Sequence, residues 1–129
     1  MKEVIVLKSN VMGDGPSELG ELLLQNFLST FHYLHSLLET SKQETSEKLS
    51  TSTIILYNTA VLIALKHEEE EKNKFYEILE KLHSKGVEII LCATCVKYFD
   101  LENKILVGRI SNMREIVEKM RSANKLITP

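Results

Sequence analysis

Short runs of consecutive apolar residues, separated by segments with helical spacing, constrain the fold of this chain more than any other feature. Such runs stand at residues 3–8, 53–57 and 87–91. A strand buried on both faces has this continuous apolar pattern, whereas a strand exposed on one face alternates apolar and polar residues. Helical segments, and no hairpin turns, separate the runs. The pattern therefore predicts an α/β fold, a parallel sheet with helices on both faces.

Two shorter strands, at residues 104–107 and 125–127, complete a predicted sheet of about five strands, the last at an edge. From Ser17 the apolar residues follow helical spacing, which predicts a helix with one buried stripe. That stripe contains Leu19, Leu22, Leu23, Phe27, Phe31, Leu34 and Leu38. The polar residues 39–52 that follow predict a loop.

Four further helices are expected. A short apolar helix follows Asn58 and Thr59 and runs through Leu65. Another follows the charged run at residues 67–72, which we interpret as a solvated first turn, and ends at Gly86 in the usual C′ position. A short helix is expected at residues 96–101. The last begins with a capping box at Asn112 and Glu115. Its predicted buried residues are Met113, Ile116, Val117 and Met120.

Length and composition exclude several classes of function. A chain of 129 residues fits one domain, residues 1–129. The net charge of −2, with basic and acidic residues interspersed, gives no basic surface for nucleic acid or for anionic lipid. No apolar run is long enough to cross a membrane or to act as a secretion signal. We expect a cytoplasmic protein, where thiols stay reduced.

The two cysteines of the chain, Cys92 and Cys95, stand three positions apart where a predicted strand ends and a helix begins. Orphan N–H groups and the positive end of the helix dipole favour the thiolate, the reactive form of cysteine, at such a place. Two small residues, Ala93 and Thr94, are expected to form the turn between them. We therefore predict that paired thiol chemistry occurs here.

A single Cys-x-x-Cys pair leaves several alternatives open. A zinc site needs about four ligands, and the histidines, His32 and His35 among them, lie on distant predicted helices. We therefore expect no metal within one chain, which leaves a zinc site between subunits as an alternative. A thioredoxin-type dithiol is a second alternative, although these cysteines follow a late strand. Sulfur transfer is a third, in which an exposed, activated thiolate carries a persulfide without a cofactor and a neighbouring thiol discharges it. Two small core residues at a strand end are the non-functional alternative.

Polar residues follow the other predicted strands and are expected at the same carboxyl edge, where ligands bind to open parallel sheets. Asn58 follows the second strand, and either Asn58 or Thr59 could instead cap the next helix. The loop after the first strand carries Asn10 and Gly13. We interpret its Gly-Asp-Gly sequence as a turn, because the glycine spacing of a nucleotide loop is missing. The predicted substrate- or partner-binding residues are Asn10, Gly13, Asn58, Thr94 and Lys97.

Several motifs resemble those of a known family. They are Met12-Gly13-Asp14-Gly15 with Glu18-Leu19-Gly20, Leu56-Tyr57-Asn58-Thr59-Ala60-Val61, Gly86-Val87-Glu88-Ile89, Cys92-Ala93-Thr94-Cys95, and Val107-Gly108-Arg109-Ile110-Ser111-Asn112-Met113. On these the chain resembles the DsrE/DsrF-like family, and most closely the C-terminal domain of YedF-type proteins, which are sulfurtransferase-like proteins of selenium metabolism. The family motif at the thiols is usually Cys-Gly-Thr-Cys, and Ala93 replaces its glycine here.

The resemblance implies a three-layer α/β/α sandwich, homo-oligomers, and a role in sulfur relay or selenium metabolism. It implies that Cys92 is the sulfur acceptor and that Cys95, which matches only the YedF-type subgroup, is its resolving partner. Lys97 would favour the thiolate. YedF-type proteins carry a TusA-like sulfur-carrier domain in front, which is not present in this sequence, so we expect a carrier in trans or a missing fused domain. The alternative function is a non-catalytic oligomeric interaction module with structural cysteines.

Overall fold

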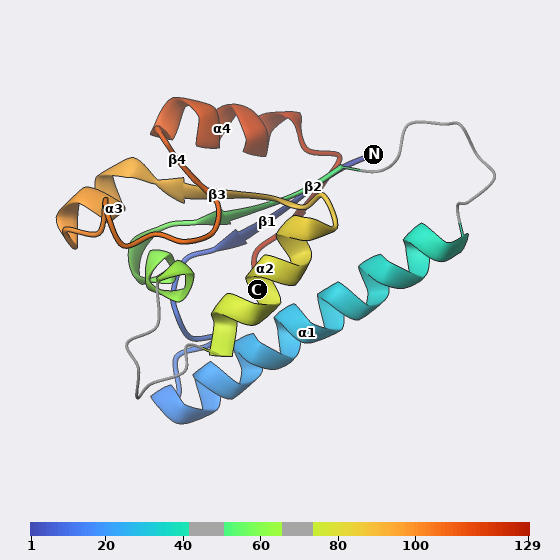
Figure 1. The fold of residues 1–129 in the computed structure, drawn as a ribbon, viewed down its shortest axis with the longest axis horizontal. Coiled ribbons are helices and arrows are strands. Elements are labelled where there is room, and N and C mark those ends of the chain that lie inside the picture. The colour runs from blue at the N-terminus through green and yellow to red at the C-terminus, as the bar shows by residue number, and fades with distance from the viewer. Residues whose placement is uncertain (42–50, 66–73) are drawn as a thin grey trace.

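Five parallel strands form the middle layer of the molecule, as the computed structural model shows (Figure 1). The structure describes residues 1–41, 51–65 and 74–129. The predicted charged turn at 67–72 and most of the predicted loop at 39–52 lie outside these residues. The strands are β1 (Lys2–Leu7), β2 (Thr51–Leu56), β3 (Glu88–Cys92), β4 (Arg109–Ser111) and β5 (Lys125–Ile127). They lie in the order β4-β3-β2-β1-β5, and every pairing is parallel.

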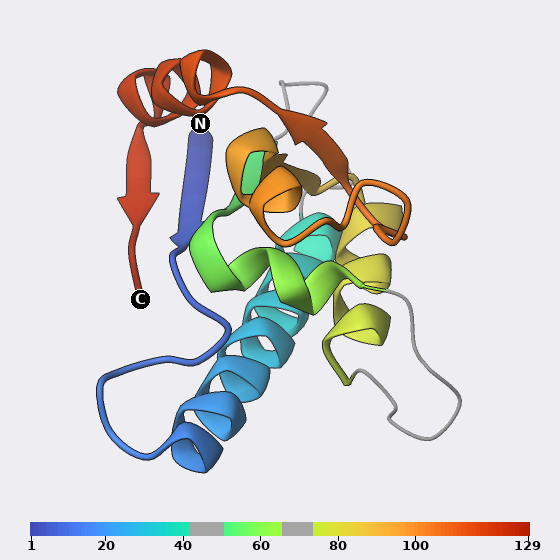
Figure 2. The same cartoon turned by 90° about the vertical axis from the view of Figure 1, so that its left-hand side faces the viewer.

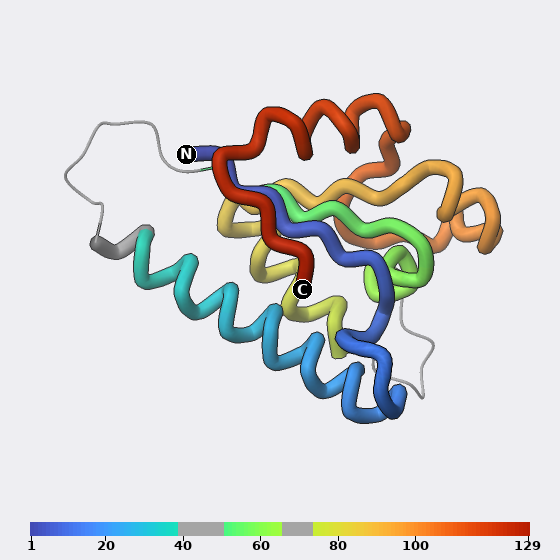
Figure 3. The backbone as a smooth tube through the Cα atoms, turned by 180° about the vertical axis from the view of Figure 1, so that it is seen from behind, coloured from blue at the N-terminus to red at the C-terminus, as the bar shows by residue number. Residues whose placement is uncertain are grey.

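Helices cover both faces of this sheet, which confirms the predicted α/β sandwich. On one face lie α1 (Ser17–Ser41), the 3₁₀ helix η1 (Asn58–Ala64) and α2 (Lys74–Ser84), and α4 (Met113–Ser122) lies on the other (Figure 1). Side chains of a strand alternate between the two faces of the sheet. Ile5 and Leu7 pack in the core between the sheet and the helices α1 and α2, while Val4 and Val6 pack in the core between the sheet and α4. Figure 3 shows β5 beside β1 at the edge of the sheet, as predicted.

The predicted position of β4 was wrong. Residues 104–107 do not pair in the sheet. Leu106 N–H instead donates to the carbonyl of Ala64, and Ile105 forms an isolated antiparallel bridge with Leu65. The chain then passes close to β3 at Gly108, whose φ is +90°, and a Cβ there would lie 2.8 Å from the carbonyl oxygen of Ile89. The strand therefore begins only after this glycine.

The buried stripe of α1 also differs from the prediction. Leu24 and Leu28 are fully buried, while Leu19, Leu23 and Leu34 are 51%, 41% and 52% exposed. The helix continues to Ser41, past the point at which the sequence predicted a loop. One apolar stripe of α1 thus packs on the sheet, and a second stripe faces outward.

The ends of the other helices follow their sequence signals. Gly86 has a φ of +89° and follows α2 as predicted. Asn112 caps α4 by accepting a hydrogen bond from the N–H of Glu115 at 2.9 Å. Of the four residues predicted to be buried on α4, only Ile116 is fully so, because this single helix touches its face of the sheet along a narrow strip.

Candidate functional site: a thiol pair at the carboxyl edge of the sheet

Strands β1, β2 and β3 end level with one another, which brings the segments that follow them to one edge. Leu7 pairs with Leu56, and Leu56 pairs with Leu91. Shortly after these ends, the chain carries Ser9 and Asn10 beyond β1, Asn58 and Thr59 beyond β2, and Cys95 beyond β3, whose last residue is Cys92. Figure 2 faces this edge and shows η1 in green beside the short helix α3 (Ala93–Tyr98) in orange.

Cys92 is the last residue of β3, and its side chain is only 1% exposed. It packs with Val6, Ile90 and Ile116 in the core beneath α4. We expected an exposed thiol here, and that expectation was wrong. The reason is that residues of β3 alternate in direction, and the direction of Cys92 is toward the face that α4 covers.

Cys95 is the more accessible of the two thiols. It lies on α3, which begins at Ala93, so the pair spans a helix start and not the expected turn. It is partly exposed and packs against the apolar cores on both faces of the sheet. Its Sγ accepts a hydrogen bond from the backbone N–H of Asn58 at 3.0 Å. Both cysteines are free thiols, and Cys95 packs against the buried cluster that contains Cys92.

The surroundings of Cys95 favour the thiol on balance. Burial raises the pKa of Cys95 above its ordinary value, and the hydrogen bond and charge of Cys92 raise it further. The N–H of Asn58 acts in the opposite direction and lowers the pKa. We predicted that the site stabilises the thiolate, and for Cys95 this was wrong, because the sum of these influences raises its pKa. One group at the site, the amide of Asn58, does favour the charged form.

The hydroxyl groups of Ser9 and Thr59, which were not among the predicted binding residues, join the strand ends. The N–H of Asn10 donates to Oγ1 of Thr59 at 3.2 Å, and this hydroxyl lies 3.4 Å from Oγ of Ser9. The side-chain oxygen of Asn58 accepts from the N–H of Thr59 at 2.8 Å. Asn10 and Asn58 are thus brought to one place, as predicted. The signal for Ser9 and Thr59 was available, because each closely follows a strand.

The remaining predicted binding residues are less tightly connected to the thiols. Thr94 and Lys97 lie exposed on α3, beside Cys95 in the chain. Lys97 is not among the groups with the largest influence on the pKa of Cys95. Gly13 is exposed with a φ of +83° in the loop between β1 and α1, which swings away from α3 in Figure 2. The part of these three residues in binding stays a prediction.

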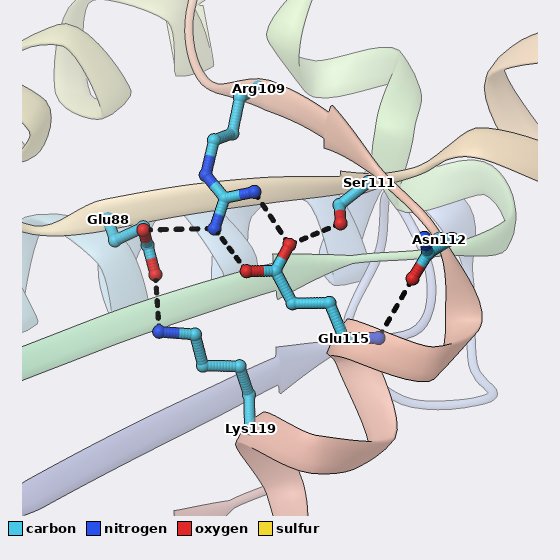
Figure 4. A network of polar contacts seen from close by, with 6 residues as sticks. All are labelled: Glu88, Arg109, Ser111, Asn112, Glu115 and Lys119. Carbon is cyan, nitrogen blue, oxygen red and sulfur yellow. Dashed lines mark hydrogen bonds and ion pairs between the residues drawn. The ribbon is translucent and has the colours of Figure 1, made fainter.

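A network of charges next to the site was also missed, because the sequence misplaced β4. Arg109 of β4 donates to both carboxylate oxygens of Glu115 at 2.6 Å and to Glu88 at 3.1 Å (Figure 4). Lys119 binds the other oxygen of Glu88 at 2.9 Å, and Ser111 donates to Glu115. Arg109 and Ser111 hold the pKa of Glu115 at about 2. The network fastens α4, the helix above Cys92, to β3 and β4.

A large hollow among the described residues lies away from the thiols. It has a volume of about 830 Å³ between α1 and the strands β1 and β5, and Leu23, Phe31 and Leu34 line it. Among the described residues, no three His, Cys, Asp or Glu side chains gather where they could hold a metal ion. None of the described helices is both long enough and apolar enough to cross a membrane.

Comparison with known proteins identifies the family. The model of the DsrE/DsrF-like family matches residues 26–129. The chain belongs to the DsrE/DsrF-like family. Among solved structures, the YchN protein of E. coli is similar with a TM-score of 0.69 and 21% identity, and the match covers 100% of both chains. MTH1491 of Methanobacterium thermoautotrophicum, a protein of unknown function, is similar with a TM-score of 0.60 and 15% identity, covering 99% of this chain and 98% of that one. These likenesses show the same fold. No curated protein matches the chain.

Proposed function

We propose that this domain of the DsrE/DsrF-like family carries sulfane sulfur on its thiol pair and passes it to an acceptor thiolate. The observation that supports this most is the contact of a partly exposed thiol, Cys95, with a second thiol and with a backbone N–H donor. A thiol that a partner can reach is needed to receive sulfur, and a neighbouring thiol provides a way to release it.

The chemistry requires no cofactor. A thiolate of the pair attacks the outer sulfur of a donor persulfide, the donor S–S bond breaks, and the donor leaves as a thiolate with the bonding electron pair. An acceptor thiolate then takes the outer sulfur in the same way, which regenerates the first thiolate. Alternatively, the second cysteine attacks the inner sulfur of the persulfide. Hydrosulfide then leaves and a Cys92–Cys95 disulfide remains, which a dithiol reductant must reset.

The second cysteine supports a finer placement. Because the chain has Cys95 in addition to Cys92, we propose that it is related to the YedF-type proteins and handles sulfur or selenium. The corresponding partner is a TusA-like carrier that presents its own thiolate. We further propose a homo-oligomer, in which the outward apolar stripe of α1 packs on another copy.

Sulfur loading tests the proposal. The reduced protein is incubated with a low-molecular-mass persulfide without oxygen, desalted and weighed intact. We expect one added sulfur atom, which disappears when a thiol-bearing carrier is added. The matched control, a Cys92→Ala, Cys95→Ser double variant, should gain none. A wild-type protein that gains no more sulfur than this control would refute the relay.

The second candidate is a non-catalytic interaction module with structural cysteines. The burial of Cys92 among aliphatic side chains favours it, as does the outward apolar stripe of α1. It predicts that the double variant loses stability and leaves every partner interaction intact, while neither protein accepts sulfur. Loading and thermal unfolding of the same two proteins therefore separate the candidates.

A further inference from the structure

We infer that Cys95, and not Cys92, carries the transferred sulfur, and that the backbone N–H of Asn58 stabilises the thiolate of Cys95 that attacks the donor. The inference rests on the proposed sulfur relay and assigns the roles within it. It reverses the roles that the sequence implied for the two cysteines. Asn58 thereby becomes a positioning residue that acts through its main chain.

Accessibility is the first argument. A donor persulfide must bring its outer sulfur into contact with the attacking thiolate, in line with the S–S bond that breaks. Cys92 is 1% exposed beneath α4, whereas Cys95 is partly exposed one helical turn later. Only Cys95 can be reached in the folded protein as it stands. Cys92 belongs to the buried cluster against which Cys95 packs, where the second thiol of a resolving step is needed.

The backbone of Asn58 is the second argument. Its φ of +53° is left-handed, a conformation that costs most residues about 1–2 kcal/mol and that asparagine tolerates better than most. This conformation directs the N–H at Sγ of Cys95 across 3.0 Å. Strained backbone of this kind is often found at functional sites, where the surrounding structure maintains it.

Contacts around Asn58 maintain that conformation. Its side-chain oxygen accepts from the N–H of Thr59, and the hydroxyl of Thr59 accepts from the N–H of Asn10. The N–H of Ala60 donates to the carbonyl of Tyr57, so the peptide group that precedes Asn58 is also held. The amide is therefore fixed before any sulfur arrives, and it offers a donor to a thiolate or a persulfide anion without rearrangement.

The step that this amide assists has a simple balance. The thiolate of Cys95 attacks the outer sulfur of the donor, a Cys95 Sγ–S bond forms, and the donor departs as a thiolate. The transferred sulfur is now the terminal atom of a persulfide on Cys95. It loses its proton to water at neutral pH and then carries the negative charge. A hydrogen bond to a charged acceptor is worth enough to change a thiolate population about tenfold.

Backbone variants at residue 58 test the positioning. Cys92→Ala serves as background, so that only Cys95 reacts, and its alkylation rate at neutral pH is measured in Asn58→Gly, Asn58→Ala and Asn58→Val. Glycine adopts positive φ freely, alanine with strain, and the β-branched valine worst. We expect the rate to fall in the order Gly, Ala, Val, with a loss of about tenfold for Val. Equal rates, or equal losses in Gly and Val, would overturn the positioning role.

A measurement without substitution at residue 58 protects the test against misfolding. The amide proton of Asn58 is followed by NMR as pH rises. We expect its resonance to move with the ionisation of Cys95 and to stay still in Cys95→Ser. A chemical shift that does not change as Cys95 ionises would contradict the hydrogen bond.

The single-cysteine variants assign the sulfur. Cys92→Ala should still gain one sulfur from the persulfide donor, and Cys95→Ser should gain none. Uptake by Cys95→Ser, but not by Cys92→Ala, would overturn this inference and leave the relay standing. Uptake by neither variant nor by the wild type would refute the relay itself, while the titration still reports on the amide of Asn58.

Discussion

At the scale of single residues, opposing influences on Cys95 decide how the site works. Burial and the neighbouring Cys92 raise the pKa of Cys95, and the amide of Asn58 lowers it. Cys95 is therefore mainly protonated at neutral pH, and its thiolate population rises as the pH rises toward its raised pKa. The thiol of Cys95 must therefore lose its proton before it can react.

Removing Cys92 should make Cys95 more reactive. In Cys92→Ala the hydrogen bond and the charge that raise the pKa of Cys95 are both lost, so this pKa falls. The alkylation rate of Cys95 at neutral pH should rise several-fold, and its pH profile should move to lower pH. A profile that coincides with that of the wild type would show that Cys92 does not act on Cys95.

A pair of glycines separates backbone strain from steric contact. Both Gly86 and Gly108 have φ near +90°, but a Cβ meets nothing within 4 Å at Gly86 and lies 2.8 Å from the main chain of β3 at Gly108. We expect Gly86→Ala to cost about 1–2 kcal/mol and Gly108→Ala about 2–5 kcal/mol. Urea unfolding measures both. Equal costs would show that the chain can move away from β3 at residue 108.

The sequence allowed the place of the thiols to be predicted, but not their exposure. Where a strand ends follows from its apolar run, so the carboxyl edge and the arrival of Asn58 there were predictable. Which face Cys92 points to depends on register, and a shift of one residue reverses it. The N–H of Asn58 carries no sequence signal at all, because its direction is a property of backbone torsion.

At the scale of elements, α4 is the part of the fold that controls access to Cys92. Its residue Ile116 packs on Cys92, and the carboxylate of Glu115 binds Arg109 of β4. Burial opposes ionisation of Glu88, but hydrogen bonds from Lys119 and Arg109 prevail and lower its pKa. Charges at neutral pH therefore hold α4 in place.

Neutralising Glu115 should loosen α4, and the effect should depend on pH. The pKa of Glu115 is about 2 in the folded protein, below its ordinary value of 4.5, so its contribution to stability is present at neutral pH and disappears as the pH falls from about 4.5 toward 2. Glu115→Gln should therefore lower the urea midpoint at pH 7 and have little effect near pH 2, and Cys92 should become easier to alkylate at pH 7.

The matched control for this change is Glu118→Gln. Glu118 forms an ion pair with Arg114 on the same helix, but both side chains are exposed and neither touches the sheet network. Its loss should be small at every pH. Similar shifts in the two variants would mean that the network of Glu88, Arg109 and Lys119 does not fasten α4.

Elements with a continuous apolar run or a clear cap were predictable, and elements fixed by tertiary contact were not. The strands β1, β2, β3 and β5, the end of α2 at Gly86 and the cap of α4 follow local signals. The position of β4 depends on the passage of Gly108 over β3. Residues 104–107 are more apolar than residues 109–111 of β4, so the sequence alone favoured the wrong segment.

At the scale of the whole molecule, helix α1 has apolar residues on two faces, and the described part of the chain buries only one of them. Leu24 and Leu28 are buried on the sheet, while Leu19, Leu23 and Leu34 are exposed. Leu23 and Leu34 also line the 830 Å³ hollow. A helix with apolar residues on both sides is usually covered on both sides. Sequence periodicity merges two such stripes, which is why the outward leucines were predicted to be buried.

The proposed oligomer gives this face a partner and a test. Leu23→Glu with Leu34→Glu places two carboxylates on the outward stripe, and we expect the variant to be monomeric at concentrations where the wild type is not. Light scattering after size exclusion measures the mass. Val117→Glu, on the exposed side of α4, is the control and should keep the mass of the wild type. A monomeric wild type would remove the oligomer from this account.

The most direct measurement is the position of the sulfur on the protein. The wild type is loaded from a persulfide donor, trapped by alkylation and digested, and the peptide that holds both cysteines is fragmented in the mass spectrometer. Our account predicts the additional sulfur on Cys95. Sulfur on Cys92 would contradict the assignment of roles, and a peptide without additional sulfur would contradict the relay.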